Sequence, residues 1–311
     1  MRRAASFAAA LVLVLAATAC QGGEPAVDAS AEPEAGGPAW GATPDAGAVT
    51  RPGALPEDAP ALAALVAEQV AAAGTLRSEV SITIPGQSRE DTLTAEVITG
   101  EEPVARITID QYTPEEGAEA EPPATELILA QDVVYALQDQ AALELGERPW
   151  IRLSREELAA YEAELGPFVA IFDQIFAIAE EARMDASTEN LVALVEAGEL
   201  TEGPVADSSE GAAAQRYEGT APMAVLGRNS ADEAYDTLIE EGVDTVEWTL
   251  LLDERGLPLR FDVQVEVETG TRALSSAAYS GWAEPIDIAL PPEDEISSLQ
   301  TLVEDAGEGG G

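Results

Sequence analysis

The sequence predicts an α+β fold in which an antiparallel sheet is covered on one face by helices. Segments that alternate apolar and polar residues recur in the first and last thirds of the chain. Such alternation is typical of antiparallel strands with one buried and one solvated face. The middle third carries helical patterns instead. Since long apolar strand faces need a cover, we expect these central helices to provide it.

The first residues have the form of a bacterial export signal. Arg2 and Arg3 precede an apolar run from Ala4 to Ala17, which is too short for a membrane-spanning helix. Small residues end at Ala19, directly before Cys20, the single cysteine of the chain. This spacing resembles the lipobox of bacterial lipoproteins. The resemblance implies cleavage after Ala19, lipid attachment to Cys20 and a location on the extracytoplasmic face of the cell membrane.

Composition divides the rest of the chain. Residues 1–19 are the expected signal peptide, and residues 20–55 are rich in Ala, Gly, Pro and acidic residues. We expect residues 20–55 to form a disordered tether, because they cannot bury enough apolar surface to offset the entropy of ordering. The alternative is that this segment packs on the domain through Trp40. A folded domain over residues 56–303 and a disordered tail over residues 304–311 complete the expected organisation.

The folded region begins with a predicted helix from Asp58 to Ala73, for which Gly74 is a suitable C-cap. Strand patterns follow, and an acidic loop from Thr113 to Pro123 interrupts them. The strands expected in this region are 79–84, 93–97, 105–109, 126–130, 133–137 and 150–153.

A capping box is predicted in the middle of the chain, with Ser154 as N-cap and Glu157 at the third helical position. The helix that it opens is expected to run towards Met184, with a bend at Gly166-Pro167. The elements expected after it are a helix over 188–196, short strands over 198–206 and 212–217, and a helix over 230–240 closed by Gly242.

The last third carries the clearest strand signal. Four apolar residues from Val246 to Leu252 alternate along one face, and a turn follows them at Glu254-Arg255-Gly256. A second long strand is expected from Leu257 to Val267 and a third from Thr271 to Tyr279. Together they predict an antiparallel meander with one long apolar face.

The same region resembles a known family. The order of Trp248, Asp253-Glu254-Arg255-Gly256-Leu257-Pro258, Tyr279-Ser280-Gly281-Trp282 and Pro291-Pro292-Glu293-Asp294 is similar to the C-terminal region of LppX/LprG lipoproteins of actinobacteria. The resemblance covers roughly residues 59–299. It implies the LolA-like fold, a strongly curved antiparallel half-barrel sheet with helices covering its concave face. It also implies a lipid or glycolipid ligand whose acyl chains lie between sheet and helices.

Composition excludes several functions. The chain has a net charge of -44, and all 15 basic residues are arginine. It therefore lacks the basic surface that nucleic acid requires. Without histidine or lysine it cannot build Ser-His-Asp, Cys-His or Schiff-base sites. No carboxylate pair stands out among its 59 acidic residues. We therefore expect a monomeric protein that is not an enzyme and holds no cofactor or metal, with its protein partner unknown.

Phenylalanines recur at helical spacing in the middle of the chain, at Phe168, Phe172 and Phe176. The stripe predicts either a helix facing an acyl-chain cavity or a helix packed in an ordinary core. The cavity hypothesis names as lining residues Phe168, Phe172, Ile175, Phe176, Trp248, Leu250, Phe261 and Val263.

Two functions are compatible with these patterns. The first is a membrane-anchored lipoprotein that binds or carries a lipid between sheet and helices. The alternative is a protein-interaction or sensory module of the cell envelope that has the same fold and a closed core. An empty volume of several hundred Å³ favours the first function, and a filled interior favours the second.

Overall fold

The protein was studied as a computed structural model, and twelve of its strands form one large sheet. All neighbouring strands in this sheet are antiparallel except β14 and β7, which are parallel. The strand order is β14-β7-β6-β5-β4-β3-β2-β12-β11-β10-β9-β8, and β1 pairs separately with β13. The structure describes residues 40–45, 47–83, 90–100, 102–112, 125–137, 148–166, 169–208, 213–229, 238–240, 242–267 and 270–300.

The strands follow one another along the chain in antiparallel pairs over most of the sheet. Their bounds are β1 Trp40–Ala42, β2 Thr75–Thr83, β3 Glu90–Ile98, β4 Val104–Tyr112, β5 Thr125–Ala130, β6 Val133–Leu137, β7 Trp150–Ser154, β8 Glu199–Asp207, β9 Ala214–Pro222, β10 Thr245–Leu252, β11 Pro258–Val267, β12 Gly270–Ser280, β13 Ile286–Ile288 and β14 Ile296–Ser298. The strands expected from the sequence are all present, and the predicted α+β class with an open, curved antiparallel sheet is confirmed.

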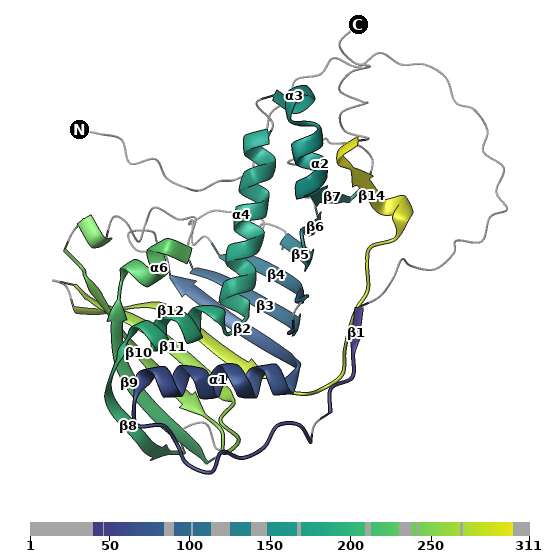
Figure 1. The fold of residues 1–311 in the computed structure, drawn as a ribbon. Coiled ribbons are helices and arrows are strands. Elements are labelled where there is room, and N and C mark those ends of the chain that lie inside the picture. Colours follow the sequence, from purple (N-terminus) through teal and green to yellow (C-terminus); the bar gives the residue numbers. More distant parts are fainter. Residues whose placement is uncertain are drawn as a thin grey trace, which may run out of the picture.

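Helices lie over one face of this sheet (Figure 1). Their bounds are α1 Ala59–Ala73, α2 Arg155–Ala160, α3 Glu162–Leu165, α4 Val169–Ala186, α5 Glu189–Ala197 and α6 Ala224–Asn229. Helix α4 packs against β2, β3, β4 and β5, whereas α5 packs against α1, β9 and α6. The main core lies between these helices and the sheet, and it includes side chains from nearly all of them.

Helix α1 forms where the sequence predicts it. The Asp58 side chain accepts a hydrogen bond from the Ala61 amide at 2.8 Å, which satisfies one of the free amides of the first turn. At the other end Gly74 adopts a left-handed conformation, with φ of 72°, and its amide donates to the Val70 carbonyl. Both helix ends are therefore fixed by local chemistry.

The predicted capping box at Ser154 is wrong, although α2 does begin directly after this residue. The Ser154 side chain makes no capping hydrogen bond. The Glu157 carboxylate instead accepts a hydrogen bond from Arg152 at 2.6 Å. A charge-assisted bond to a guanidinium is stronger than a bond to a neutral backbone amide, so Glu157 turns towards the strand rather than the helix end.

The single bent helix expected from Ser154 to Met184 is also wrong. The chain forms α2 and α3, reverses direction, and returns along α4, so that a helical hairpin stands over the sheet (Figure 1). Gly166 lies at the reversal with φ of 55° and ψ of -121°, a conformation that a residue with a Cβ rarely adopts. Arg155 of α2 lies over the Phe176 ring of α4, 4.6 Å from its centroid, and joins the two arms.

The opposite face of the sheet is partly covered by the pair β1–β13. Trp40 pairs with Ile288, and Ala42 pairs with Ile286. These two isoleucines are buried in a second, smaller apolar cluster with residues of β4 to β7, and Trp40 packs against it. The chain therefore packs on the domain at Trp40, within the segment that was expected to form the tether.

Other predicted elements lie outside the described residues. These are the signal peptide, Cys20 and the tether up to residue 39, the acidic loop over 113–123, and the tail. The helix expected over 230–240 is described from residue 238 to 240, where it is helical. Helix α6, just before it, was not expected from the sequence.

Candidate functional site

The phenylalanine stripe faces the core beneath α4. Phe172 and Phe176 are buried there, and Ile175 is half-buried against the same cluster. Helix α4, which carries these rings, packs against β2, β3, β4 and β5. Phe168, the remaining member of the predicted stripe, lies outside the described residues.

The predicted lining residues on strands lie together on β10 and β11. Trp248 pairs with Val263, and Leu250 pairs with Phe261, across β10 and β11. All four side chains are buried, and the rings of Trp248 and Phe261 lie 6.3 Å apart. The predicted lining therefore forms two groups over different strands of one core. Whether the two groups enclose a ligand stays a prediction.

An open groove is found elsewhere, where α1, α5, the end of α4 and the turn after β3 meet. Its volume is about 440 Å³. The α1–α5 groove, as we call it, is lined by Ala67, Val70, Ala71, Val97, Thr99, Gly100, Pro103, Arg183, Ser187, Thr188, Glu189, Val192, Ala193 and Glu196. Apolar residues make up half of this set, and all of them are alanine, valine or proline. The groove can therefore accept apolar groups along its length, with polar partners at its side.

The groove is assembled from three segments that are separate in the sequence: residues 67–71, residues 97–103, and residues 183–196 at the junction of α4 and α5. The Thr99 amide donates to the Gly74 carbonyl at 2.9 Å, which holds the turn after β3 against the end of α1. Helix α5 packs along α1 and forms the facing wall. The Thr99 hydroxyl is buried, and it has no hydrogen-bond partner within the described residues.

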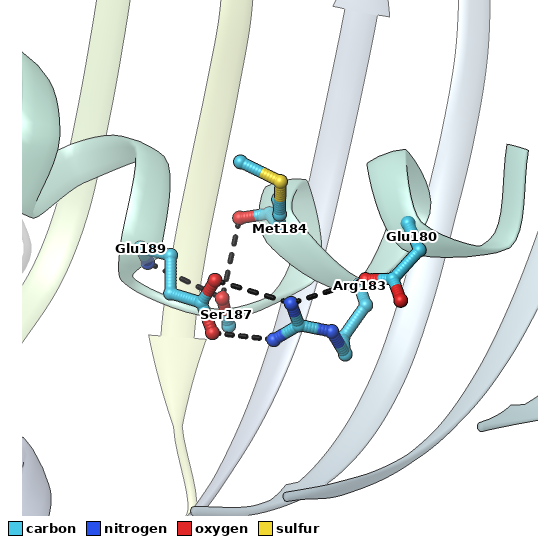
Figure 2. A network of polar contacts seen from close by, with 5 residues as sticks. All are labelled: Glu180, Arg183, Met184, Ser187 and Glu189. Carbon is cyan, nitrogen blue, oxygen red and sulfur yellow. Dashed lines mark hydrogen bonds and ion pairs between the residues drawn. The ribbon is translucent and has the colours of Figure 1, made fainter. Parts of the chain in front are cut away.

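Arg183 forms the polar side of the groove (Figure 2). Its guanidinium donates two hydrogen bonds to the Glu189 carboxylate, one of them 3.2 Å long, and one to Glu180 at 3.3 Å. Burial alone lowers the pKa of Arg183. The hydrogen bonds and charges of Glu189 and then Glu180 outweigh it and leave the pKa above its usual value. Arg183 is therefore a fixed cation that links α4 to α5.

The corner between α4 and α5 is bonded to the sheet beneath it. The Ser78 hydroxyl donates to the Ala186 carbonyl at 2.7 Å, and the Tyr279 hydroxyl donates to the Ser187 carbonyl at 3.4 Å. Asp185 lies in this corner. Burial raises the pKa of its carboxyl to about 7, and the nearby charge of Glu181 adds to the effect. The corner between the two helices therefore contains a carboxyl group whose pKa is raised towards neutrality, although Asp185 does not itself line the groove.

A second hollow of about 450 Å³ lies over β12, β2, β3 and β4. Most of the residues that line it are polar, and four of them are charged. Arg77 donates to Glu96 at 3.1 Å and to Glu284 at 2.6 Å, and Arg106 donates to Glu126. Because its arginines are already paired with carboxylates and few apolar side chains line it, this hollow is a poor site for an acyl chain.

No family model and no curated protein sequence matches the chain, but solved structures do. The fold is similar to that of LprF from Mycobacterium bovis. The two share 14% sequence identity with a TM-score of 0.44, over 75% of this chain and 97% of LprF.

A second similar structure is the MucA/MucB complex of Pseudomonas aeruginosa. It has 14% identity and a TM-score of 0.29, over 76% of this chain and 59% of that one. At these values neither likeness bears on the α1–α5 groove.

Sequence reasoning missed the α1–α5 groove. No pattern of residues identifies it, because its walls come from α1, the β3–β4 turn, α4 and α5. The one available signal was Arg183, a single basic residue between Glu180 and Glu189 in a strongly acidic chain. None of the described helices has the length and apolarity needed to cross a membrane. Within the described residues, no group of acidic, His or Cys side chains is arranged to hold a metal ion.

Proposed function

We propose that the chain is an envelope lipoprotein, anchored through Cys20, that binds an acyl chain in the α1–α5 groove. The groove of about 440 Å³ carries this proposal. It is apolar along α1 and α5, at Val70, Val192 and Ala193, and polar at Arg183 and Thr99. This division suits an amphiphile, whose chain gains by leaving water while its head keeps polar contacts.

Binding is tested with a secreted form that begins at Gln21. This form lacks Cys20 but retains every described residue, so any lipid found on it is held non-covalently. Native mass spectrometry with solvent extraction then identifies a co-purified lipid, and a fluorescent fatty-acyl probe measures affinity. We expect a defined lipid mass and saturable binding of the probe.

Blocking the groove supplies the matched control. Ala67 lines the groove and is exposed, so Ala67→Trp fills the groove without disturbing the core. Ala64 is also exposed on α1 but does not line the groove. We expect Ala67→Trp to abolish probe binding and Ala64→Trp to leave it unchanged. Equal binding by both variants would exclude the groove as the acyl site.

The anchor is tested separately. Labelling cells with an alkyne fatty acid should mark the wild-type chain at Cys20, and Cys20→Ala should remove the label. An unlabelled wild-type chain, or a labelled Cys20→Ala chain, would contradict the lipobox assignment.

The protein-interaction module remains the second candidate, and one observation favours it. Phe172, Phe176, Trp248, Leu250, Phe261 and Val263, which were expected to line a cavity, are buried in one continuous core. A protein free of lipid that also refuses the acyl probe would support this second function. A protein with bound lipid would exclude a protein-interaction module that binds no lipid.

A further inference from the structure

The ionic groups of the α1–α5 groove bear on the chemical class of its ligand, and the selectivity inferred from them rests on the acyl-binding function proposed above. Among the described residues that line the groove, Arg183 is the one cation, and Glu189 and Glu196 are the two carboxylates. Glu180, just outside the groove, adds a third carboxylate next to Arg183. The polar side of the groove is therefore negatively charged in sum.

Arg183 is not available to an anionic headgroup. Its side chain is 17% exposed, and the guanidinium is bonded to both Glu189 and Glu180. A phosphate or carboxylate head could reach Arg183 only by displacing Glu189. That displacement would leave the Glu189 charge unpaired beside a second negative charge, which is costly in a partly desolvated site.

The groove does offer hydrogen-bond acceptors. Glu196 is exposed and forms no ion pair with any described residue, so its carboxylate is open to a cation. A primary ammonium group has three donors and no acceptor, and so it matches this carboxylate.

We propose that the α1–α5 groove selects single-chain amphiphiles with a primary ammonium head and rejects those with an anionic head. The alkyl chain lies along the apolar residues of α1 and α5. The ammonium group lies at the polar side, within reach of Glu196.

Three probes with the same chain length test this selection: dodecylamine, dodecanol and dodecanoate. Each competes with the fluorescent acyl probe on the secreted form that begins at Gln21, at neutral pH and low salt. We expect dodecylamine to displace the probe at a concentration about tenfold lower than dodecanoate, with dodecanol between them. Salt at about 0.5 M should shrink the difference, since exposed charges are screened.

A charge-matched pair of variants separates the groove from the general negative charge of the protein, -44 in all. Glu196→Gln removes a carboxylate that lines the groove, and Glu266→Gln removes an exposed one on β11. We expect Glu196→Gln to reduce the preference for dodecylamine over dodecanol severalfold. Glu266→Gln should leave this preference unchanged.

The remaining outcomes show which of the two claims, acyl binding or charge selection, is wrong. If dodecanol binds but dodecylamine and dodecanoate bind equally well, the charge selection is wrong while the acyl-binding function stands. The same holds if Glu196→Gln keeps the full preference for dodecylamine. If none of the three amphiphiles displaces the probe, the acyl-binding function and the charge selection both fail.

Discussion

The side-chain amide of Asn190 donates a hydrogen bond of 2.8 Å to the Asp185 carboxyl group, across the corner where α4 gives way to α5. Burial raises the pKa of Asp185 to about 7, the charge of Glu181 raises it further, and the bond from Asn190 acts in the opposite direction. Arg183, Ser187 and Thr188 of the same corner line the α1–α5 groove, whereas Asp185 does not, so the charge of Asp185 is expected to affect stability.

Stability should therefore fall as pH rises from about 4 to about 7. An unfolded Asp titrates near 3.9, so between these values the folded chain binds more protons than the unfolded chain, and raising the pH favours unfolding. Asp185→Asn removes this dependence and keeps the acceptor oxygen for Asn190. Urea denaturation at pH 5 and pH 8 measures this effect. At pH 8 the Asp185→Asn variant should be more stable than the wild type, by a few kcal/mol at most.

Asp173→Asn is the control for this experiment, because Asp173 is an exposed carboxylate on the same helix. It should follow the pH dependence of the wild type. If Asp185→Asn followed it too, the Asp185 carboxyl group would be ionised in the folded protein at neutral pH.

Phe176→Ala should destabilise the protein by about 3–5 kcal/mol, because the ring is buried in the core and leaves a cavity when removed. Arg155→Ala, which removes the cation above the ring, should cost about 0.5–1 kcal/mol. Ile178→Ala serves as the control, since Ile178 is 40% exposed on α4 and its loss should have a small effect. Urea midpoints give all three values, and an equal loss at Phe176 and Ile178 would contradict the packing of α4.

Gly219 lies opposite Trp248 in the pairing of β9 with β10. A Cβ at this position would overlap the Trp248 ring and the carbonyl oxygen of Glu199. Gly219→Ala should therefore cost about 1–3 kcal/mol or more through overpacking. Gly53→Ala is the control, because nothing lies within 4 Å of the new Cβ there. Thermal unfolding compares the two, and a neutral Gly219→Ala would mean that the indole does not lie against this strand.

Removing β1 should open the second apolar cluster. A chain that begins at Thr43 loses the pairing of Trp40 with Ile288 and of Ala42 with Ile286, whereas a chain that begins at Gly36 keeps it. We expect faster hydrogen exchange at the amides of β13 in the shorter chain, with β10 and β11 unaffected. Identical exchange in both chains would show that β1 does not protect β13.

The sequence predicted the elements whose signals are local. Alternation placed the strands, and Asp58 and Gly74 marked both ends of α1, because a cap is a contact between near neighbours. The face of each strand in the final meander followed from period two alone. Val246, Trp248 and Leu250 are all buried as this pattern requires.

Features that depend on distant contacts were not predictable. The order that places β12 beside β2 joins residues about 200 positions apart, and no local pattern records it. Trp40 looked isolated in a polar segment because its partner, Ile288, lies near the other end of the chain. The α1–α5 groove was missed for the same reason, and the Phe172 stripe, which does have a local pattern, drew the prediction to the core instead.

The path of the chain from Trp40 to Asp58 sets how the domain responds to force. Three residue pairs hold β1 to β13 over the second apolar cluster, and Pro44 then lies against Gly74. If Cys20 is anchored, tension on the chain acts on these residue pairs one after another before it reaches α1. Peeling the segment from Trp40 to Asp58 would lengthen the tether by up to about 60 Å, and it would remove Val49 alone of this segment's side chains from the main core. The domain thus carries a reserve of reach that a fixed attachment at α1 would lack.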